Sequence, residues 1–373
     1  MRLPVRLPPP ATAAAATAAA VIAAVALRRY LRTRSSMATS AHRRGGSAGG
    51  VALVVSGKST EDQRLLASAA GSLALGEGDS VEEITVSRDS GAGAGAGAGF
   101  DAAAYMGALR ASRFGRWMLW SPSMASTHDL VTQNFAKLPV GVVCVAGVQF
   151  RGRGRSKNVW ESPAGCLMFS FTSQMEDARK LPLMQYVVCL AMTEAIKELC
   201  CYKGLPELEV KIKWPNDLYL KGLKVGGILC TSSYQPKVYN ICTGIGLNVD
   251  NKEPTTCLNA ALKEMKANSP TLKREDILAS FFNKFEVLFE IFSNEGFQAL
   301  EEQYYNSWLH SGQKVVVQDG PEAQRADSVV TIQGLTPAGY LYAIGEDGKS
   351  YELHPDGNSF DFFAGLVRRK MET

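Results

Sequence analysis

Short β-branched segments alternate with long amphipathic segments between residues 115 and 310, so this region has to build a sheet together with helices that cover it. We expect strands at residues 139–149, 166–171, 210–214 and 238–249. We expect helices at residues 129–137, 183–202, 274–292 and 297–309. Ser126 or Thr127 can cap the first of these helices, and Lys221-Gly222 between two apolar segments indicates a hairpin. The pattern predicts an α+β fold.

The pattern changes after residue 311, where short β segments are separated by turn residues such as Asp319-Gly320 and Asp347-Gly348. The expected strands are residues 314–318, 328–332, 340–344 and 350–353. Several short strands at regular spacing are typical of a small barrel. We therefore expect a C-terminal β-barrel domain at residues 311–373.

The first 50 residues are rich in alanine and arginine and contain no acidic residue, which is typical of an organelle transit peptide. The apolar stretch at residues 13–27 is an alternative signal, for secretion or for a membrane anchor. We interpret residues 1–50 as a transit peptide for the plastid, the mitochondrion or both. A product that starts at Met37 would lack most of the arginines, so we expect it to stay in the cytosol.

The charge of the remaining chain disfavours a nucleic-acid partner. The whole chain has 40 basic and 36 acidic residues, but eight of the arginines lie within residues 1–44. The other residues therefore carry 32 basic and 36 acidic side chains, a net charge of −4. A basic surface is the electrostatic signature of proteins that bind nucleic acid. We expect neither nucleic acid nor a membrane as a partner.

The eight cysteines show no C-x-x-C spacing, and most lie in apolar segments such as the one around Cys144. We interpret them as buried, reduced thiols in a reducing compartment, with a disulfide framework or a zinc site as the alternatives. No residue is assigned to a protein-bound metal.

Residues 51–90 form a small segment of unknown role, which a Gly/Ala linker at residues 91–99 separates from the main body. A strand at residues 51–56 is followed by Gly57-Lys58-Ser59-Thr60. A phosphate-binding loop of this kind needs a second glycine five residues earlier, where the chain has Ala52. We therefore do not assign phosphate binding to this motif.

A basic loop follows the expected strand at residues 139–149. It contains Gly152-Arg153-Gly154-Arg155, with Arg151 before it and Lys157 after it. Backbone N–H groups and guanidinium groups in such a loop can approach a phosphate or a carboxylate closely. The alternative is a solvated basic loop of the kind found on RNA-binding proteins.

A second motif, Lys213-Trp214-Pro215-Asn216-Asp217, stands where a strand ends. It displays an amine, an amide and a carboxylate at a strand end, although a turn with a surface Lys–Asp pair is the alternative. Glycines at residues 226–227, 244 and 246 interrupt later strands. Such glycines often mark the close approach of a ligand or of another backbone.

Taken in order, the motifs resemble those of the biotin–protein ligases, also called holocarboxylase synthetases, and most resemble the organelle-targeted plant enzymes. The matching residues are Ser126-Thr127-His128, Gln149, the loop at 152–155, Trp160-Glu161-Ser162-Pro163, and residues 213–219, 224–229 and 244–249. The resemblance runs from about residue 115 to the C-terminus. It implies a mixed-sheet ligase-like catalytic domain at residues 115–310 and an SH3-like barrel at 311–373.

The resemblance implies an ATP-dependent ligase that uses biotin, ATP and Mg²⁺. Biotin is activated as biotinyl-5′-AMP and then transferred to the acceptor lysine of a biotin carboxyl carrier domain of a carboxylase. The first step brings two anions together, which requires nearby cations. A monomer or a homodimer is expected.

The resemblance also implies roles for individual residues. Catalysis is assigned to Lys213, Asp217 and Arg155. Biotin binding is assigned to Ser126, Thr127, His128, Gln149, Arg153, Gly154, Arg155 and Lys213. Binding of ATP and the adenylate is assigned to Gly152, Arg153, Arg155, Trp160, Asn216, Lys224, Gly244 and Asn248.

Three of these assignments have alternatives. His128 stands where many relatives carry an amide. Trp160 can stack on adenine or serve as a buried hydrophobic anchor. Asp217 can orient or deprotonate the incoming lysine, or tie the turn to the backbone.

Three other functions compete with this interpretation. Lipoate–protein ligases share the fold and also catalyse an activation step followed by a transfer step. An RNA-binding module would use the basic loop to bind RNA. A non-catalytic regulator would bind biotin without turning it over. The combination of residues 213–217 with the loop at 152–155 favours a biotin ligase.

The targeting hypothesis predicts the behaviour of two reporter fusions. A reporter fused to residues 1–60 should enter plastids or mitochondria, whereas one fused to residues 37–60 should stay largely cytosolic. Fluorescence microscopy of the two fusions checks this, and identical localisation would refute the assignment.

Overall fold

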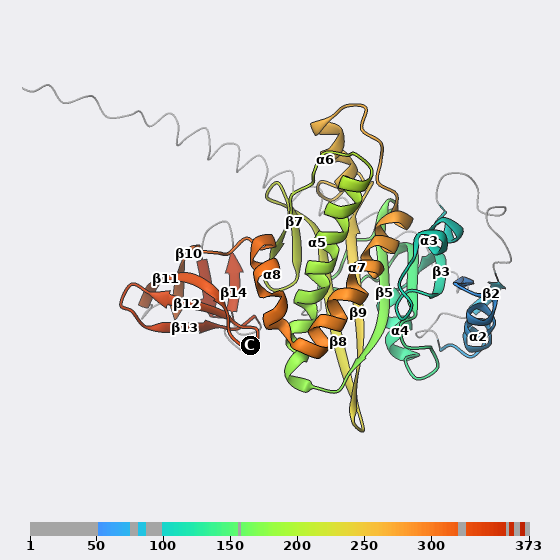
Figure 1. Cartoon of the computed structure of the whole chain (residues 1–373), viewed down its shortest axis with the longest axis horizontal. Helices are drawn as coiled ribbons and strands as arrows, with labels where there is room; N and C mark the ends of the chain where they lie inside the picture. The colour runs from blue at the N-terminus through green and yellow to red at the C-terminus, as the bar shows by residue number, and fades with distance from the viewer. Residues whose placement is uncertain are drawn as a thin grey trace, which may run out of the picture. The chain divides into compact units, whose positions relative to one another are not determined.

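A computed structural model describes residues 51–74, 81–86, 99–155, 158–319, 326–355, 358–361 and 366–369. These residues form a mixed α+β fold with two sheets (Figure 1), as the sequence predicts. The predicted transit peptide, Met37, Lys157 and residues 91–98 of the linker lie outside the described residues.

The larger sheet has nine strands in the order β2-β1-β3-β4-β5-β9-β8-β7-β6. Its strands are β1 (Val51–Gly57), β2 (Val81–Val86), β3 (Trp117–Met124), β4 (Val143–Gln149), β5 (Cys166–Met175), β6 (Val210–Lys213), β7 (Asp217–Leu220), β8 (Leu223–Gln235) and β9 (Val238–Asn248). The pairs β1–β2 and β3–β4 are parallel, and the other neighbours are antiparallel. The sheet is therefore mixed.

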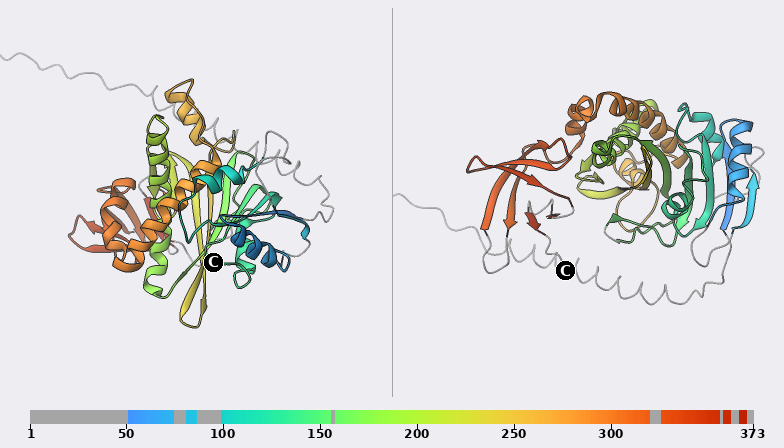
Figure 2. Two further views of the ribbon diagram at one scale, coloured as in Figure 1. Left: turned by 45° about the vertical axis from the view of Figure 1, so that its right-hand side comes forward. Right: turned by 90° about the horizontal axis from the view of Figure 1, so that it is seen from below.

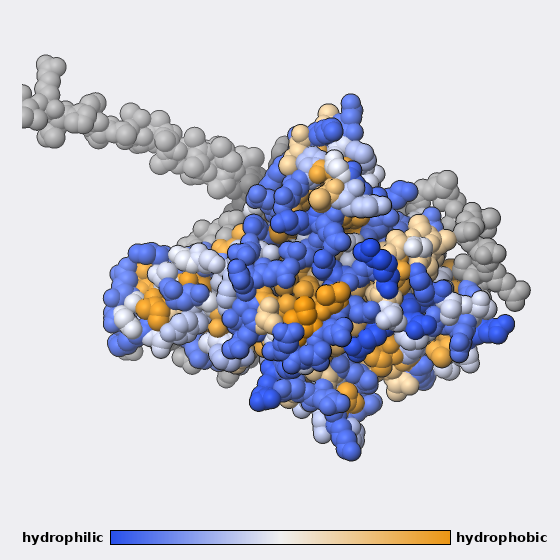
Figure 3. Space-filling view, in the orientation of Figure 1, coloured by the Kyte–Doolittle hydropathy of each residue, from blue (hydrophilic) through white to orange (hydrophobic). Residues whose placement is uncertain are grey.

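Helices cover both faces of this sheet. They are α2 (Thr60–Ala70), α3 (Ala102–Ala108), α4 (Thr127–Gln133), η3 (Ala178–Leu183), α5 (Met184–Tyr202), α6 (Leu258–Met265), α7 (Arg274–Glu295), η4 (Phe297–Leu300) and α8 (Glu301–Ser307). The long helices α5 and α7 lie side by side over one face (Figure 1). Figure 3 shows this side of the molecule, mostly hydrophilic with an apolar area over the helical layer.

The alternation of side chains along the strands divides the core into two layers. Leu167, Phe169 and Phe171 of β5 belong to the layer under α5 and α7. Cys166 and Met168 point to the opposite face, in a second cluster that joins α2 and α4 to β1, β3 and β4. On this same face of the sheet, next to the second cluster, strands β8 and β9 line the cavity that is described below.

Several element boundaries differ from the sequence prediction, among them the end of β5 at Met175, and three of the differences have a clear local cause. β4 begins at Val143, because Gly141 (φ +96°) makes a turn before it. α4 runs over Thr127–Gln133, because the Asn134 side chain accepts and donates hydrogen bonds at its end. The helix expected at residues 297–309 is η4 followed by α8 and stops before Trp308, which pairs with Ile212 in a β-bridge.

Residues 51–74 belong to the same sheet as the main body. β1 pairs with β3 in antiparallel register, and Figure 2 shows β1, β2 and α2 at the edge of the sheet. Asn134, 1% exposed, binds the backbone of Ala74 through both of its amide atoms, at 2.7 and 2.6 Å. The segment is thus attached to the C-terminal end of α4. The domain boundaries drawn from the sequence remain a prediction.

The Gly57–Thr60 motif makes structural contacts. Ser59 caps α2 and forms a capping box with Asp62. Lys58 Nζ donates to the carbonyl oxygens of Met106 and Leu109 near the end of α3, where a cation is favourable.

The C-terminal region forms a six-stranded sheet in the order β13-β12-β11-β10-β15-β14. Its strands are β10 (Lys314–Asp319), β11 (Ala326–Leu335), β12 (Leu341–Gly345), β13 (Ser350–Leu353), β14 (Asn358–Asp361) and β15 (Leu366–Arg369). The expected change to short strands is confirmed. Closure of this sheet into an SH3-like barrel stays a prediction.

The eight cysteines are free thiols, and only Cys201 is exposed. Burial raises the pKa of Cys144 above its usual value and that of Cys242 to about 12. The buried thiols of Cys144 and Cys242 are therefore neutral at physiological pH and contribute to packing, as the sequence pattern indicates.

The attachment of Ala74 to α4 predicts a large effect of one substitution. Asn134→Ala would remove both hydrogen bonds to the backbone of Ala74, which are part-buried, and should lower the free energy of unfolding by about 1–3 kcal/mol. Urea unfolding measures the change, with Gln133→Ala at the exposed neighbouring position as the control. Equal losses in the two variants would show that the attachment contributes nothing specific.

Candidate active site

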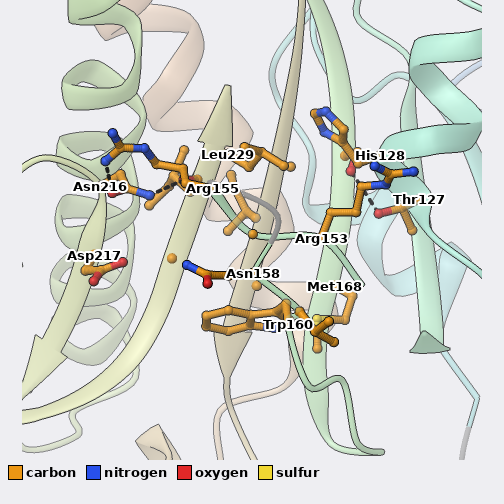
Figure 4. A pocket seen from close by; sticks show the side chains of 18 of the residues that line it. Thr127, His128, Arg153, Arg155, Asn158, Trp160, Met168, Asn216, Asp217 and Leu229 are labelled. Carbon is orange, nitrogen blue, oxygen red and sulfur yellow. Dashed lines mark hydrogen bonds between the residues drawn. The ribbon is translucent and has the colours of Figure 1, made fainter. Parts of the chain in front are cut away.

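A cavity of about 440 Å³ opens on the sheet face opposite α5 and α7. It lies between the start of α4, the basic loop after β4, the turn between β6 and β7, and the strands β5, β8 and β9. Figure 4 shows side chains from these elements converging on the cavity, with Thr127 and Arg153 on one side and Arg155 and Asn216 on the other. The motifs that are separated in the sequence thus meet in one place.

The start of α4 supplies a polar end to the cavity. Ser126 is the N-cap of α4, and its hydroxyl accepts from the backbone N–H of Asp129 at 3.2 Å. The side-chain oxygen of Gln149 accepts from the backbone N–H of Thr127 at 2.8 Å and from its hydroxyl at 3.0 Å. A further hydroxyl, that of Ser170 on β5, lies 2.8 Å from the Thr127 hydroxyl. These groups form a chain of donors and acceptors of fixed orientation.

His128 lies beside this chain and is 7% exposed. Its Nε2 is 3.0 Å from the hydroxyl of Thr231, and its Nδ1 is 3.4 Å from the thiol of Cys242. The pKa of His128 is lowered to about 4, chiefly because the ring is buried; the Asp129 carboxylate acts to raise the pKa and Arg153 acts to lower it. The imidazole is therefore neutral at physiological pH.

Two arginines of the basic loop are held by different partners. Arg153 pairs with the Asp129 carboxylate at 2.7 Å, next to the start of α4. Arg155 donates to the side-chain oxygen of Asn216 at 3.1 Å, which ties the loop to the turn after β6. Gly154 donates from its backbone to the carbonyl of Asn158 at 2.8 Å. The loop thereby presents cations on both sides of the cavity (Figure 4).

The turn at residues 213–217 is attached to the neighbouring strand β8. The side-chain amide of Asn216 donates to the carbonyl of Ile228, and the Ile228 N–H donates to the Asn216 carbonyl at 2.9 Å. Asp217 and Lys224 form an ion pair at 2.7 Å. Because Asp217 is directly opposite Lys213 in the β6–β7 hairpin, the turn brings an amine and a carboxylate to the cavity together.

Trp160 forms part of the cavity floor and explains two of the glycines. A Cβ atom on Gly246 would lie 2.4 Å from Nε1 of Trp160, and one on Gly227 would lie 3.2 Å from the same ring. Lys224 lies over the ring, with its Nζ 5.3 Å from the ring centroid. At these two glycines the close approach is made by a side chain, whereas the sequence predicted a ligand or another backbone.

Two residues expected to bind the adenylate do not line this cavity. Asn248 is 4% exposed and donates to Thr255 and Thr256, so its amide serves the loop after β9. Gly152 lies in an adjoining groove, where a Cβ would come within 2.5 Å of the Trp160 carbonyl. The other predicted site residues all line the cavity.

Several residues that line the cavity were not predicted from the sequence. They include Asn158, Met168, Ser170, Leu229 and Pro355. Because side chains alternate between the two faces of a strand, the sequence of β5 places Met168 and Ser170 on the same face of the sheet. This alternation is the signal that could have identified them as lining residues. Nothing in the sequence pattern points to Pro355, which comes from the C-terminal sheet.

Positive charge dominates the cavity. Arg153, Arg155, Lys213 and Lys224 line it, and Asp217 is the carboxylate among the described lining residues. The described part of the chain contains no group of three or more His, Cys, Asp or Glu residues that could hold a metal ion. One end of the cavity is lined by the polar groups of Thr127 and Gln149, and cations lie beside it. This arrangement fits an anionic ligand that also carries hydrogen-bonding groups.

Comparisons with known proteins agree on one family. Residues 120–248 match the Biotin/lipoate A/B protein ligase family. The chain is 56% identical to the chloroplastic biotin–protein ligase 1 of Arabidopsis thaliana over 86% of this chain and 88% of that protein. It is 60% identical to biotin–protein ligase 2 of the same plant, over 73% of this chain and 83% of that protein.

A solved structure supports the fold. A mutant biotin protein ligase from Aquifex aeolicus, in complex with biotin, matches with a TM-score of 0.50 and 24% identity. The match covers 63% of this chain and 94% of that one.

The buried imidazole of His128 predicts a pH-dependent stability. Between about pH 6.5 and pH 4 the unfolded chain binds a proton at His128 that the folded chain does not, so the free energy of unfolding falls as the pH falls. His128→Asn should therefore remove about 2 kcal/mol of the decrease between pH 7 and pH 5. Urea unfolding at the two pH values measures it, and an unchanged decrease in the variant would contradict the prediction.

Proposed function

Because the chain belongs to the biotin–protein ligase family, we propose that it activates biotin with ATP and transfers it to a lysine of a carboxyl carrier domain. The relatives named above are biotin–protein ligases, which supports biotin over lipoate as the substrate. Convergence of Lys213, Arg153 and Arg155 on one cavity carries the proposal, because the first step joins two anions.

Biotin is a carboxylate with a polar ureido ring, and the cavity offers a partner for each part. We assign the ureido ring to the chain of polar groups formed by Ser126, Thr127 and Gln149. The carboxylate is assigned to the basic side of the cavity, at Lys213 and the loop arginines. His128 lies at the polar end as a neutral hydrogen-bonding group.

In the first step a biotin carboxylate oxygen attacks the α-phosphorus of ATP. The new bond is the C–O–P bond of biotinyl-5′-AMP, and the bond from the α-phosphorus to the leaving pyrophosphate breaks. Negative charge builds up between the two reactants, and Lys213 with Arg155 stabilises it electrostatically. Arg155 is tied to Asn216 beside Lys213, so these cations act from neighbouring positions.

In the second step the neutral ε-amine of the acceptor lysine attacks the carbonyl carbon of the mixed anhydride. An amide bond forms, AMP leaves with the electron pair of the broken C–O bond, and the amine loses a proton. Asp217 is paired with Lys224, so we assign it the role of holding Lys224 near the phosphate. We propose that the adenine lies near Trp160, whose ring rests on Gly227 and Gly246.

Mg²⁺ would reach this site with the nucleotide. Mg²⁺ is usually held by one or two carboxylates together with substrate phosphates. Among the described lining residues Asp217 is such a carboxylate, and it is already paired with Lys224. The ion would therefore be held mainly by the phosphates, whose charge it neutralises when bound.

We propose a plastid location, supported by the chloroplastic relative and the acid-free first 50 residues. A mitochondrial form and a cytosolic form from Met37 stay predictions, as does the choice between monomer and homodimer. In the described part of the chain, no helix has the length and apolar character needed to cross a membrane.

Removing the Lys213 amine tests the first step. Lys213→Ala should slow biotin-dependent exchange of pyrophosphate into ATP by about 10²-fold, because a preorganised charge is lost from the transition state. Lys211→Ala is the matched control, since Lys211 lies on the same strand but outside the cavity. An exchange rate of Lys213→Ala within threefold of the wild type would refute the assignment.

A further inference from the structure

Trp214, next to Lys213, is fixed by groups from outside its own hairpin. It is 3% exposed, and its backbone N–H donates to Nε2 of His310 at 2.9 Å. Its indole N–H donates to the hydroxyl of Tyr186 at 2.8 Å and to the carbonyl of Gly339 at 3.3 Å. These partners belong to α5, to the segment before the C-terminal sheet, and to the turn between β11 and β12.

The hydrogen bond from the Trp214 backbone determines which tautomer the His310 imidazole adopts. A backbone N–H can only donate, so Nε2 of His310 must accept and Nδ1 must carry the proton. That proton points to the side-chain oxygen of Gln313, 3.0 Å away. The pKa of His310 is lowered to about 4, chiefly because the ring is buried; the hydrogen bond with Gln313 acts to raise the pKa and the charge of Lys213 acts to lower it. His310 is thus a neutral acceptor, fully buried and close enough to Lys213 to respond to its charge.

The Gly339 turn is shaped for its contact with α5 and Trp214. Gly339 has φ +86°, and a Cβ there would lie 3.0 Å from Leu183 and 3.1 Å from Tyr186. The Tyr186 hydroxyl donates to the Gly339 carbonyl at 2.5 Å, and it also accepts the indole proton of Trp214. The turn between β11 and β12 is therefore bound to Trp214 directly, through the Gly339 carbonyl, and indirectly, through the Tyr186 hydroxyl.

The segment that leads to the C-terminal sheet also follows β6. Trp308 forms a parallel bridge with Ile212, and Leu309 donates from its backbone to the Ile212 carbonyl at 3.0 Å. Pro355, after β13, lines the cavity itself. The C-terminal region is thus in contact with the end of β6, where the cavity begins.

We propose that His310 and the Gly339 turn are positioning elements for the adenylation step. By holding both N–H groups of Trp214, they fix the end of β6 and with it the Lys213 amine. The inference rests on the proposed function, because it assigns the role of these residues in that reaction. A reacting group misplaced by about 1 Å can cost two orders of magnitude in rate, so this support matters for catalysis.

Two substitutions at His310 distinguish a role in positioning the Lys213 amine from a general role in folding. His310→Leu removes the acceptor for the Trp214 N–H and should slow biotin-dependent pyrophosphate exchange at least tenfold. His310→Gln can offer a side-chain oxygen at the same place and should recover most of the wild-type rate. Each rate is taken per folded molecule, with the folded fraction measured by circular dichroism.

A pair of tyrosine variants gives a second, milder test. Tyr186→Phe removes the hydroxyl that binds Trp214 and should slow the exchange about threefold. Tyr304→Phe is the matched control, because Tyr304 is buried beside Tyr186 and its hydroxyl has no hydrogen-bond partner among the described residues. Its exchange rate should equal that of the wild type.

A double-mutant cycle shows whether His310 acts through Lys213. In a Lys213→Ala background, His310→Leu should cost less than a further twofold, because the amine that it positions is gone. An equal cost in both backgrounds would overturn the inference, as would His310→Leu or Tyr186→Phe at the wild-type rate. Absence of exchange in the wild-type protein would instead refute the proposed function itself.

Discussion

The convergence of cations on one cavity is the constraint on which the site depends. Arg153, Arg155, Lys213 and Lys224 repel one another when no anion is bound, and that repulsion is stronger away from bulk water. The fold offsets this repulsion by giving three of the cations separate partners. Arg153 pairs with Asp129 and Lys224 pairs with Asp217. Arg155 donates to Asn216, which lies in the same turn as Lys213. An anionic substrate then enters a field that is already in place, which is the condition for electrostatic catalysis.

The sheet supplies the rigidity that this arrangement needs. Strands β5, β8 and β9 form the floor, and the absence of side chains at Gly227 and Gly246 lets the Trp160 ring lie against it. The turn that bears Lys213 is attached on one side to β8 through Asn216 and Ile228. On the other side it is attached through Trp214 to α5, His310 and the C-terminal sheet. The turn that bears Lys213 is thus in contact with elements of both sheets.

Local signals in the sequence predicted much of this arrangement. The alternation in β6 and the Lys221-Gly222 turn were sufficient to predict the β6 strand and the β7–β8 hairpin, because alternation and left-handed turn residues act over a few positions. Long-range contacts were not predictable in this way. Asn248 resembles the other motif residues but serves a neighbouring loop, and Pro355 reaches the cavity only through the placement of the C-terminal sheet. Likewise, the attachment of residues 51–74 to α4 depends on the buried amide of Asn134, which no local pattern indicates.

The transfer of biotin to a protein lysine is the most direct test of the whole account. Purified protein is incubated with biotin, MgATP and an apo carrier domain, and the biotin attached to the carrier is located by mass spectrometry. We expect ATP-dependent attachment of biotin to a single lysine of the carrier, and no attachment when ATP is omitted. A protein that binds biotin but leaves the carrier unlabelled would contradict it and would indicate a non-catalytic biotin-binding protein.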